Sequence, residues 1–214
     1  MSAARFLVVL DADSTLIHNE VIELFAEHAG SLELVADITL RAMNGELDFA
    51  QSLNARVATL AGLADSAFDA VADRIRVTDG AQELVDTVHA AGGAVGVVSG
   101  GFHEILDDLG ERLGLDFWRA NRLEVADGTI TGRVTGDIVD AAAKADALLA
   151  WAAQTGIPAE RSIAVGDGAN DLQMMAVAGL SVAFNAKEPV RGAADIIIDR
   201  QDLSLLLPLL GLRG

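Results

Sequence analysis

Residues 6–15 have the sequence FLVVLDADST, an unbroken apolar run followed directly by two aspartates. An apolar run of this length is typical of a strand that is buried on both faces of a parallel sheet. Asp11 and Asp13 would then lie where the strand opens into a loop, which is where open α/β sheets bind their ligands. The same residues also fit a strand that ends in a simple polar turn, because Asp and Ser favour turns. The rest of the chain is needed to choose between these two interpretations.

The composition excludes several classes of function. The chain has 214 residues, enough for one large domain or for a core with a smaller insertion. Its 15 basic and 32 acidic residues give a formal charge of −17, so nucleic acid is not an expected partner. It has no cysteine, which excludes disulfides and thiolate metal sites. No apolar run approaches the roughly 20 residues of a membrane span, so we expect a cytoplasmic protein without a membrane partner, either a monomer or a homodimer.

Residues 15–76 contain no strand-like run, and their apolar residues recur at helical spacing. The helical segments end at or near Gly30, Gly45 and Gly62, and glycine commonly follows the last turn of a helix. We therefore expect a helical cap domain of about four helices at 15–76, inserted directly after the first strand. Residues 1–14 and 77–214 would form the core domain.

Beyond residue 80 the patterns of strands and helices alternate. Strands are expected at 94–98, 115–118, 162–165, 180–184 and 195–199, and helices at 81–91, 102–113, 140–155, after 171 to about 178, and from 203. Asp127-Gly128, between 122–125 and 129–134, is a strong signal for a β-hairpin. This alternation predicts an α/β fold with a parallel sheet covered by helices on both faces.

Three predicted strands are followed by polar clusters, and in a parallel sheet such ends meet at one edge. Besides the first aspartates, Ser99-Gly100-Gly101 follows one strand and is expected to open a helix, where backbone N–H groups can bind an anion. A flexible strand–helix turn is the alternative for this short motif.

The third cluster lies in Gly166-Asp167-Gly168-Ala169-Asn170-Asp171. Its carboxylate and amide oxygens suit Mg²⁺. A capped helix would explain Asn170 or Asp171, but it would not explain why Asp167 should join Asp11 and Asp13. Several carboxylates at one edge repel each other unless a cation is present, which favours a metal site.

Lysine is rare in this chain, and one of its two lysines stands out by its context. Only Lys144 and Lys187 are lysines among the 15 basic residues, and Lys144 lies in the first turn of a helix, where a cation opposes the helix dipole. It is either a solvated lysine or a compact charge aimed at a phosphate and at Asp11. Lys187 has no such context and is expected on the surface.

Arg56 shares a helical stripe with Phe49, Leu53 and Leu60. A guanidinium on an apolar stripe needs an anionic partner, either a ligand or an acid of the same insertion. Glu20 flanks the stripe of its own helix, and by position alone it fits a solvated charge. The four histidines show no ligand spacing, so they are expected to be structural or exposed.

The motifs DADST at 11–15, SGGF at 99–102, Lys144 and GDGAND at 166–171 together resemble the haloacid dehalogenase superfamily. With a small helical cap that carries Glu20, Met43, Phe49 and Arg56, the chain is most similar to the members that hydrolyse O-phospho-L-serine. The resemblance implies a Rossmann-like core with a helical cap after the first strand. It also implies the last step of serine biosynthesis as the reaction.

The resemblance implies the following roles at the core. Asp11 is the nucleophile that forms an aspartyl phosphate, and Asp13 is the general acid and then the general base. Mg²⁺ is held by Asp11, the backbone carbonyl of Asp13 and Asp167, with Asp171 in support. The phosphate is held by Ser99, Gly100 and Lys144, with Asn170 close by. We expect Mg²⁺ and Lys144 to keep Asp11 ionised, and Asp11 and burial to raise the pKa of Asp13.

In the cap, the resemblance implies that Arg56 binds the substrate carboxylate and Glu20 its ammonium group, while Met43 and Phe49 line the apolar side. The first predicted strand begins within a few residues of Met1, which leaves no room for the amino-terminal regulatory domains of certain relatives. Feedback control by serine through such a domain is therefore not expected.

Two other functions remain open. The first is a phosphatase or phosphotransferase of the same superfamily that acts on another small phosphate ester. The second is a receiver-type signalling domain that keeps its aspartyl phosphate. Such receivers lack the second aspartate and the large cap, so the sequence favours the enzyme.

Overall fold

The structure is a computed structural model that describes residues 6–212. It contains a seven-stranded sheet in the order β4-β3-β2-β1-β5-β6-β7. The strands are β1 (Leu7–Leu10), β2 (Ala94–Phe102), β3 (Phe117–Ala126), β4 (Thr129–Thr135), β5 (Ser162–Gly166), β6 (Leu180–Phe184) and β7 (Ile196–Ile198). All neighbouring pairs are parallel except β3–β4, which form an antiparallel hairpin. The predicted α/β class is therefore confirmed.

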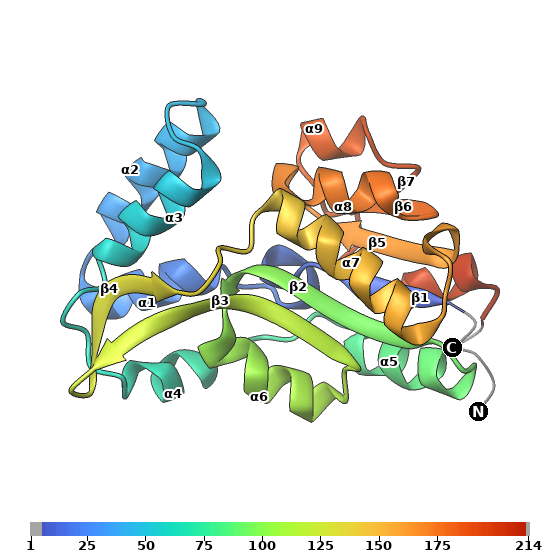
Figure 1. Cartoon of the computed structure of the whole chain (residues 1–214), viewed down its shortest axis with the longest axis horizontal. Helices are drawn as coiled ribbons and strands as arrows, with labels where there is room; N and C mark the ends of the chain where they lie inside the picture. Colours follow the sequence, from blue (N-terminus) through green and yellow to red (C-terminus); the bar gives the residue numbers. More distant parts are fainter. Residues whose placement is uncertain (1–5, 213–214) are drawn as a thin grey trace.

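Helices cover both faces of this sheet (Figure 1). On one face lie α5 (Ala81–Ala90), α6 (His103–Leu113) and the 3₁₀ helix η4 (Leu203–Leu210). On the other lie α7 (Ala141–Thr155), α8 (Leu172–Val177) and α9 (Glu188–Arg191). The side chains of β1 alternate between the two layers: Val8 and Leu10 pack in one, and Leu7 and Val9 in the other. All four are fully buried, which explains why the first strand is apolar throughout.

The insertion after β1 contains four helices, the number predicted. They are α1 (Val21–Ala29), α2 (Leu32–Met43), α3 (Phe49–Ala58) and α4 (Ala67–Ala72). The two ends of the insertion lie next to each other, because Ile17 and Val77 form an antiparallel bridge. We propose the division into a core of residues 1–14 and 77–214 and a cap of 15–76; residues 1–5 and 213–214 of these ranges lie outside the described residues.

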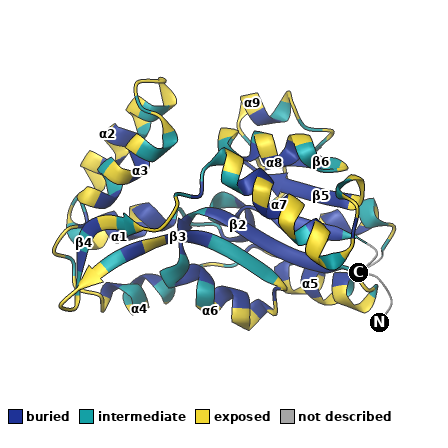
Figure 2. Cartoon of the chain, viewed as in Figure 1, coloured by how far each residue is buried: buried dark blue, intermediate teal, exposed yellow. Residues whose placement is uncertain are grey.

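The helices α2 and α3 project from the body of the molecule and carry much of the exposed surface of the cap (Figures 1 and 2). The base of the cap is attached to the core. Phe25 of α1 packs edge-on against Phe102 of β2, with ring centroids 6.0 Å apart. The loop between α3 and α4 pairs with the hairpin, since the backbones of Leu63 and Ile130 are hydrogen-bonded at 2.8 Å. The cap is therefore attached to the sheet at its base, while its tip, formed by α2 and α3, projects away from the body of the molecule (Figure 1).

Two local predictions were wrong. Strand β2 continues to Phe102, so α6 begins only at His103, and Ser99-Gly100-Gly101 do not form the first turn of a helix. Val98 pairs with Arg119 and Phe102 with Asn121, so β2 carries two extra residues and bulges there. The predicted strands at 115–118 and 122–125 are parts of one strand, β3, because pairing with β2 and β4 outweighs the weak strand propensity of the residues between them.

Other local predictions hold. Asp140 caps α7, and its side chain accepts a hydrogen bond of 2.9 Å from the amide of Ala143. Asp127 and Gly128 both have positive φ, as the tight turn of the hairpin requires. The short helix α9 had no predicted counterpart, and the C-terminal helix η4 is of the 3₁₀ type. Within residues 6–212, no helix combines the length and the hydropathy needed to cross a membrane.

Candidate active site

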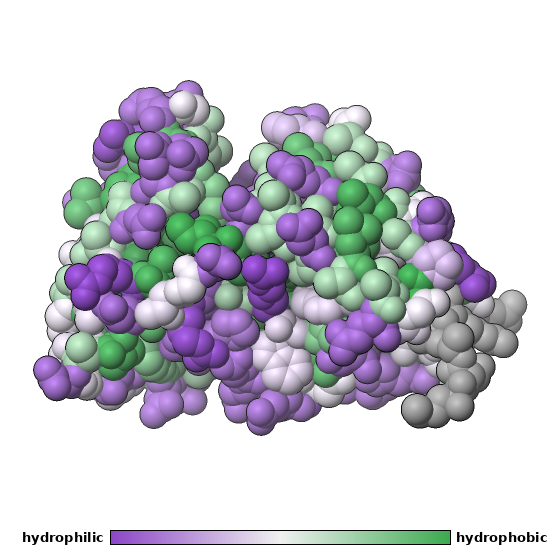
Figure 3. Space-filling model, in the orientation of Figure 1, coloured by the Kyte–Doolittle hydropathy of each residue, from purple (hydrophilic) through white to green (hydrophobic). Residues whose placement is uncertain are grey.

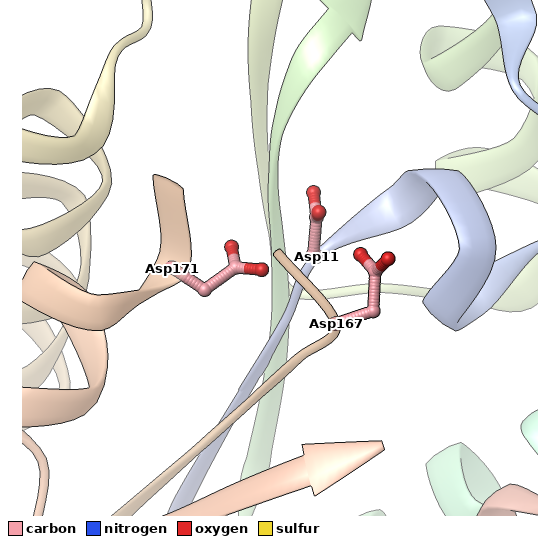
Figure 4. A group of neighbouring side chains, drawn as sticks. All are labelled: Asp11, Asp167 and Asp171. Atoms are coloured by element: carbon pink, nitrogen blue, oxygen red, sulfur yellow. The ribbon is translucent and has the colours of Figure 1, made fainter. Parts of the chain in front are cut away.

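Three aspartates converge at the carboxyl edge of the sheet (Figure 4). Asp11 follows β1 and Asp167 follows β5, while Asp171 ends the short helix η3 (Ala169–Asp171) that leads into α8. The backbone holds the two strand ends together, because the amide of Asp11 donates to the carbonyl of Val165 at 2.9 Å. One carboxylate oxygen from each aspartate lies within 4.8 Å of the others, and all three residues are buried. The strand topology thus brings together the residues that the sequence placed far apart.

Lys144 lies inside this cluster and not on the surface. Its Nζ is 2.7 Å from Oδ1 of Asp11 and 2.7 Å from Oδ1 of Asp171, and its side chain is fully buried. Burial alone would lower the pKa of Lys144, but the two carboxylates outweigh burial and raise it above its usual value. The lysine is therefore a fixed positive charge in the site.

The charge of Lys144 does not balance the carboxylates. Burial, together with the charge of Asp171, raises the pKa of Asp11 to about 8, although Lys144 acts in the opposite direction. Burial and Asp171 likewise raise the pKa of Asp167 to about 6. Lys144 alone thus does not keep Asp11 ionised. Three buried carboxylates with one lysine form an oxygen-rich site with an excess of negative charge, which suits a hard divalent cation.

Close packing requires a glycine beside the cluster. The carboxylate of Asp171 accepts hydrogen bonds from Lys144 and, at 3.1 Å, from the amide of Gly168. A Cβ added at Gly166 would lie 2.2 Å from Oδ2 of Asp171. Gly166 therefore leaves the space that the buried aspartate fills.

Asp13 lies in the turn η1 (Ala12–Leu16) that follows β1, and its carboxyl group faces the same cavity. Its Oδ1 is buried and has no hydrogen-bond partner in the described part of the chain. Burial, then the charges of Glu20 and Asp11, raise the pKa of Asp13 well above its usual value. This pKa is shifted in the direction expected from the sequence. A carboxyl group that stays protonated can donate a proton.

The bulge of β2 forms another wall of the cavity. Ser99 is buried, and its Oγ accepts a hydrogen bond of 2.8 Å from the amide of Gly101. A Cβ on Gly101 would lie 3.0 Å from this oxygen and 3.3 Å from Oδ2 of Asp13. The glycine therefore lets the bulge approach Asp13 closely. Ser99, Gly100 and Asn170 all line the cavity, as predicted from their places in the sequence.

The cap contributes Glu20, Phe49 and Arg56 to the same cavity. Oε1 of Glu20 accepts a hydrogen bond of 2.7 Å from Oγ of Ser14 in the turn η1, so this carboxylate is held and is not a free surface charge. Among residues 6–212, no carboxylate lies within the 4 Å of an ion pair with Arg56, whose Nε donates only to the carbonyl of Ser52 at 3.3 Å. Burial lowers the pKa of Arg56, while the nearby charges of Glu20 and Asp13 act in the opposite direction. The guanidinium is thus available to an anion in the cavity.

Three of the predicted site residues are not among those that line the cavity. Lys144 and Asp171 are fully buried beside Asp11, whereas Met43 lies away from the site. Met43 ends α2, and 69% of its surface is exposed. The reason is the position of the cap tip, which stands apart from the core across the cleft visible in Figure 3. Leu60, from the predicted stripe of Arg56, is fully buried in the hydrophobic core, while Leu53 of the same stripe also lines the cavity.

Lys187 was assigned to the surface, yet it lines the cavity. Its Nζ lies 3.9 Å from Oδ2 of Asp167, although most of its side chain is exposed. The available signal was its place a few residues after the predicted strand at 180–184, similar to the place that singled out Asp167. None of the four histidines is among the described residues that line the cavity.

Comparison with known proteins identifies the family. The family model for haloacid dehalogenase-like hydrolases matches residues 8–176. The chain therefore belongs to the haloacid dehalogenase-like hydrolases, and the resemblance seen in its motifs is confirmed.

Two curated relatives have the name phosphoserine phosphatase. The protein of Streptomyces coelicolor is 56% identical over 209 residues, which are 98% of this chain and 51% of that protein. The protein of Streptococcus thermophilus is 51% identical over 210 residues, which are 98% of both chains. The chain thus spans about half the length of the first relative and nearly all of the second.

Solved structures agree with the fold. A structure described as a phospho-aspartyl intermediate analogue of phosphoserine phosphatase superposes with a TM-score of 0.90 at 42% identity, covering 98% of this chain and 100% of the other. A substrate-bound phosphoserine phosphatase complex also gives a TM-score of 0.90 at 42% identity, covering 98% and 99%. The core and the cap insertion together therefore have the architecture of these enzymes.

Proposed function

We propose that the chain hydrolyses O-phospho-L-serine to L-serine and phosphate through an aspartyl phosphate on Asp11. One observation carries this proposal: a single cavity joins the Asp11–Lys144 cluster of the core to Glu20 and Arg56 of the cap. The first pair suits a phosphate, and the second suits the ammonium and carboxylate groups of an amino acid. The names of the relatives and of the superposed structures support the same substrate.

The donor set fits a metal ion, and we propose Mg²⁺. Asp11, the backbone carbonyl of Asp13, and Asp167 would hold it, with Asp171 beside them. When bound, the ion would offset the charge of the carboxylates and of the phosphate. It would also favour the ionised form of Asp11, which the buried carboxylates otherwise disfavour.

The residues then divide the reaction into two steps. In the first, a carboxylate oxygen of Asp11 attacks the phosphorus, the bond from phosphorus to the seryl oxygen breaks, and Asp13 gives its proton to that oxygen. In the second, Asp13 takes a proton from a water molecule, whose oxygen attacks the phosphorus and releases Asp11. Lys144, Ser99 and the amide of Gly100 stabilise the charge of the phosphoryl group, with Asn170 close to it.

The cap chooses the substrate in this proposal. Arg56 binds the carboxylate of phosphoserine, Glu20 binds its ammonium group, and Phe49 covers the short apolar side. Met43 can reach the substrate only if the tip formed by α2 and α3 closes over the core, which would also exclude bulk water. We further propose that the enzyme acts in the cytoplasm in the last step of serine biosynthesis, as a monomer or a homodimer.

A phosphate-release screen tests this function. The purified protein is given O-phospho-L-serine, O-phospho-L-threonine, p-nitrophenyl phosphate and small sugar phosphates, each with Mg²⁺ and with EDTA. We expect O-phospho-L-serine to give the highest kcat/KM and EDTA to abolish release. A clear preference for a substrate without an α-amino acid group would contradict the assignment. A stable phosphoenzyme without phosphate release would favour the receiver-type function.

A further inference from the structure

Asn121 is a buried polar residue beside the site that the mechanism above does not use. It lies on β3, directly opposite the bulge of β2, where the register moves from Val98–Arg119 to Phe102–Asn121. Only 2% of its surface is exposed. A polar side chain buried this deeply costs free energy unless its hydrogen-bonding groups are satisfied, so its partners show what it holds in place.

Both ends of the Asn121 amide have partners. Nδ2 donates to the carbonyl of Gly100 at 2.9 Å, and Oδ1 accepts from the amide of Val139 at 2.9 Å. Gly100 lies in the bulge that lines the cavity. Val139 immediately precedes Asp140, the N-cap of α7, which carries Lys144 in its first turn. One side chain therefore links the bulge to the start of the helix that supplies the buried lysine.

The peptide group between Gly100 and Gly101 is held at both of its polar atoms. Its carbonyl oxygen accepts from Asn121, and its N–H donates to Oγ of Ser99 at 2.8 Å. Two adjacent glycines have little intrinsic preference between the two orientations of this peptide. The reversed orientation would take the N–H away from Ser99 and turn the carbonyl oxygen toward Oγ of Ser99, where it would compete with an anion for the hydroxyl proton.

The same contact orients the hydroxyl group of Ser99. Because Oγ of Ser99 accepts from the amide of Gly101, its own O–H is left free to donate toward the cavity. This donor then depends on the peptide orientation, and the orientation depends on the bond from Asn121. The effect of Asn121 would therefore reach the phosphate through two intervening groups, without direct contact.

We propose that Asn121 is a positioning residue, which fixes the Gly100–Gly101 peptide and, through it, the anion-binding hydroxyl group of Ser99. The inference rests on the proposed phosphatase function. A residue with a purely structural role would affect the stability of the fold and leave the affinity for phosphate unchanged.

The test compares Asn121→Asp and Asn121→Leu with Ser181→Ala. The aspartate keeps an acceptor for the amide of Val139 but lacks the donor to Gly100, and the leucine lacks both groups without adding a charge. Ser181 is a matched control. It lies on β6, outside the cavity, it is also buried, and its Oγ donates a hydrogen bond of 2.7 Å to Asp195. For each protein, the Kd for inorganic phosphate is measured by calorimetry with Mg²⁺ present, together with Tm and kcat/KM for O-phospho-L-serine.

We expect both Asn121 variants to bind phosphate about tenfold more weakly, the effect of one lost hydrogen bond on a binding constant. Ser181→Ala should lower Tm about as much as the Asn121 variants do, but it should keep the wild-type Kd for phosphate. Hydrogen exchange at the Gly101 amide gives a second measurement, and it should be faster in Asn121→Asp and unchanged in Ser181→Ala.

Unchanged phosphate affinity in folded Asn121 variants would overturn the inference. Loss of the folded state in both variants would also overturn it, because Asn121 would then serve the fold and not the site. A wild-type protein that hydrolyses no phosphate ester and binds no phosphate would instead overturn the proposed function, and this inference with it.

Discussion

The ammonium group of Lys144 lies 2.7 Å from a carboxylate oxygen of Asp11, in a position from which solvent is completely excluded. The two residues lie far apart in the sequence, and they meet because α7 packs on the face of the sheet that carries Leu7 and Val9 of β1. The buried ammonium group depends on Asp11 and on Asp171, whose Oδ1 also lies 2.7 Å from it, for its stability. This relationship gives the site both its chemistry and a measurable effect on stability.

Lys144→Met tests that relationship. The substitution leaves Asp11 and Asp171 buried without their positive partner, a loss that typically costs about 3–5 kcal/mol. We expect a large fall in the free energy of unfolding, measured by urea denaturation, and phosphatase activity below detection. Lys187→Met is the matched control, because that side chain is largely exposed, and it should leave the free energy of unfolding nearly unchanged. Equal stability of the two variants would contradict the importance of the buried pair.

The metal-free protein should become less stable as the pH rises through the pKa values of its buried acids. Burial and neighbouring carboxylates raise the pKa of Asp167 to about 6 and that of Asp11 to about 8. A raised pKa in the folded state means that the folded state binds the proton more tightly, so this stabilisation is fully present below the unfolded pKa and is lost above the folded one.

The measurement is Tm in EDTA between pH 5.5 and pH 9. We expect Tm to fall across this range, and added Mg²⁺ to raise it most at the alkaline end, where the carboxylates are ionised. Asp11→Asn, which has no proton to lose, should show a shallower fall. A Tm that rises steadily with pH in EDTA would contradict this account of the site.

Arg56→Ala tests the choice of substrate. The guanidinium has no carboxylate within ion-pair distance among the described residues, and Arg56 lines the cavity together with Glu20. Its loss should raise KM for O-phospho-L-serine by roughly 100-fold, as expected for an ionic contact of about 2–3 kcal/mol. KM for p-nitrophenyl phosphate, which has no carboxylate, should change far less.

The control for that comparison is Arg41→Ala in the same cap. Arg41 is exposed and pairs with Glu46 at 3.1 Å, outside the cavity. It should leave both KM values unchanged. If Arg56→Ala raised KM equally for the two substrates, Arg56 would not determine the substrate specificity. Such a result would not contradict the phosphatase activity itself.

Asp13→Asn tests the proton transfers. The amide cannot give a proton to the leaving oxygen or take one from water, so both steps should slow, and kcat should fall by at least about 100-fold. A substrate with a good leaving group, such as p-nitrophenyl phosphate, needs less help in the first step and should show a smaller loss in a single-turnover burst. A wild-type kcat for O-phospho-L-serine in this variant would exclude Asp13 as the acid and base.

The sequence predicted the site residues that directly follow strands of the parallel sheet. The apolar run before Asp11 and the motif at 166–171 each mark a strand and a polar cluster, and parallel topology requires that they meet. Lys144 could be suspected because a lysine in the first turn of a helix opposes the dipole and the chain otherwise uses arginine. The ion pairs of its amine could not be predicted, since they depend on how α7 packs.

The remaining differences arise from tertiary pairing. The bulge at Ser99 was mistaken for the start of a helix, because glycines permit both conformations and only the register with β3 decides. Asn121, opposite that bulge, has no motif of its own. Met43 lies away from the cavity because the position of the cap tip depends on domain geometry, which local spacing does not encode.

The most direct test of the whole account is phosphate release from O-phospho-L-serine, with Mg²⁺, by the wild-type protein and by Asp11→Asn. The substitution is isosteric and reduces the crowding of carboxylates, so the variant should fold with a Tm at or above that of the metal-free wild type. We predict rapid release by the wild type and none by the variant. Release at the wild-type rate by folded Asp11→Asn would contradict the central claim that Asp11 is the nucleophile.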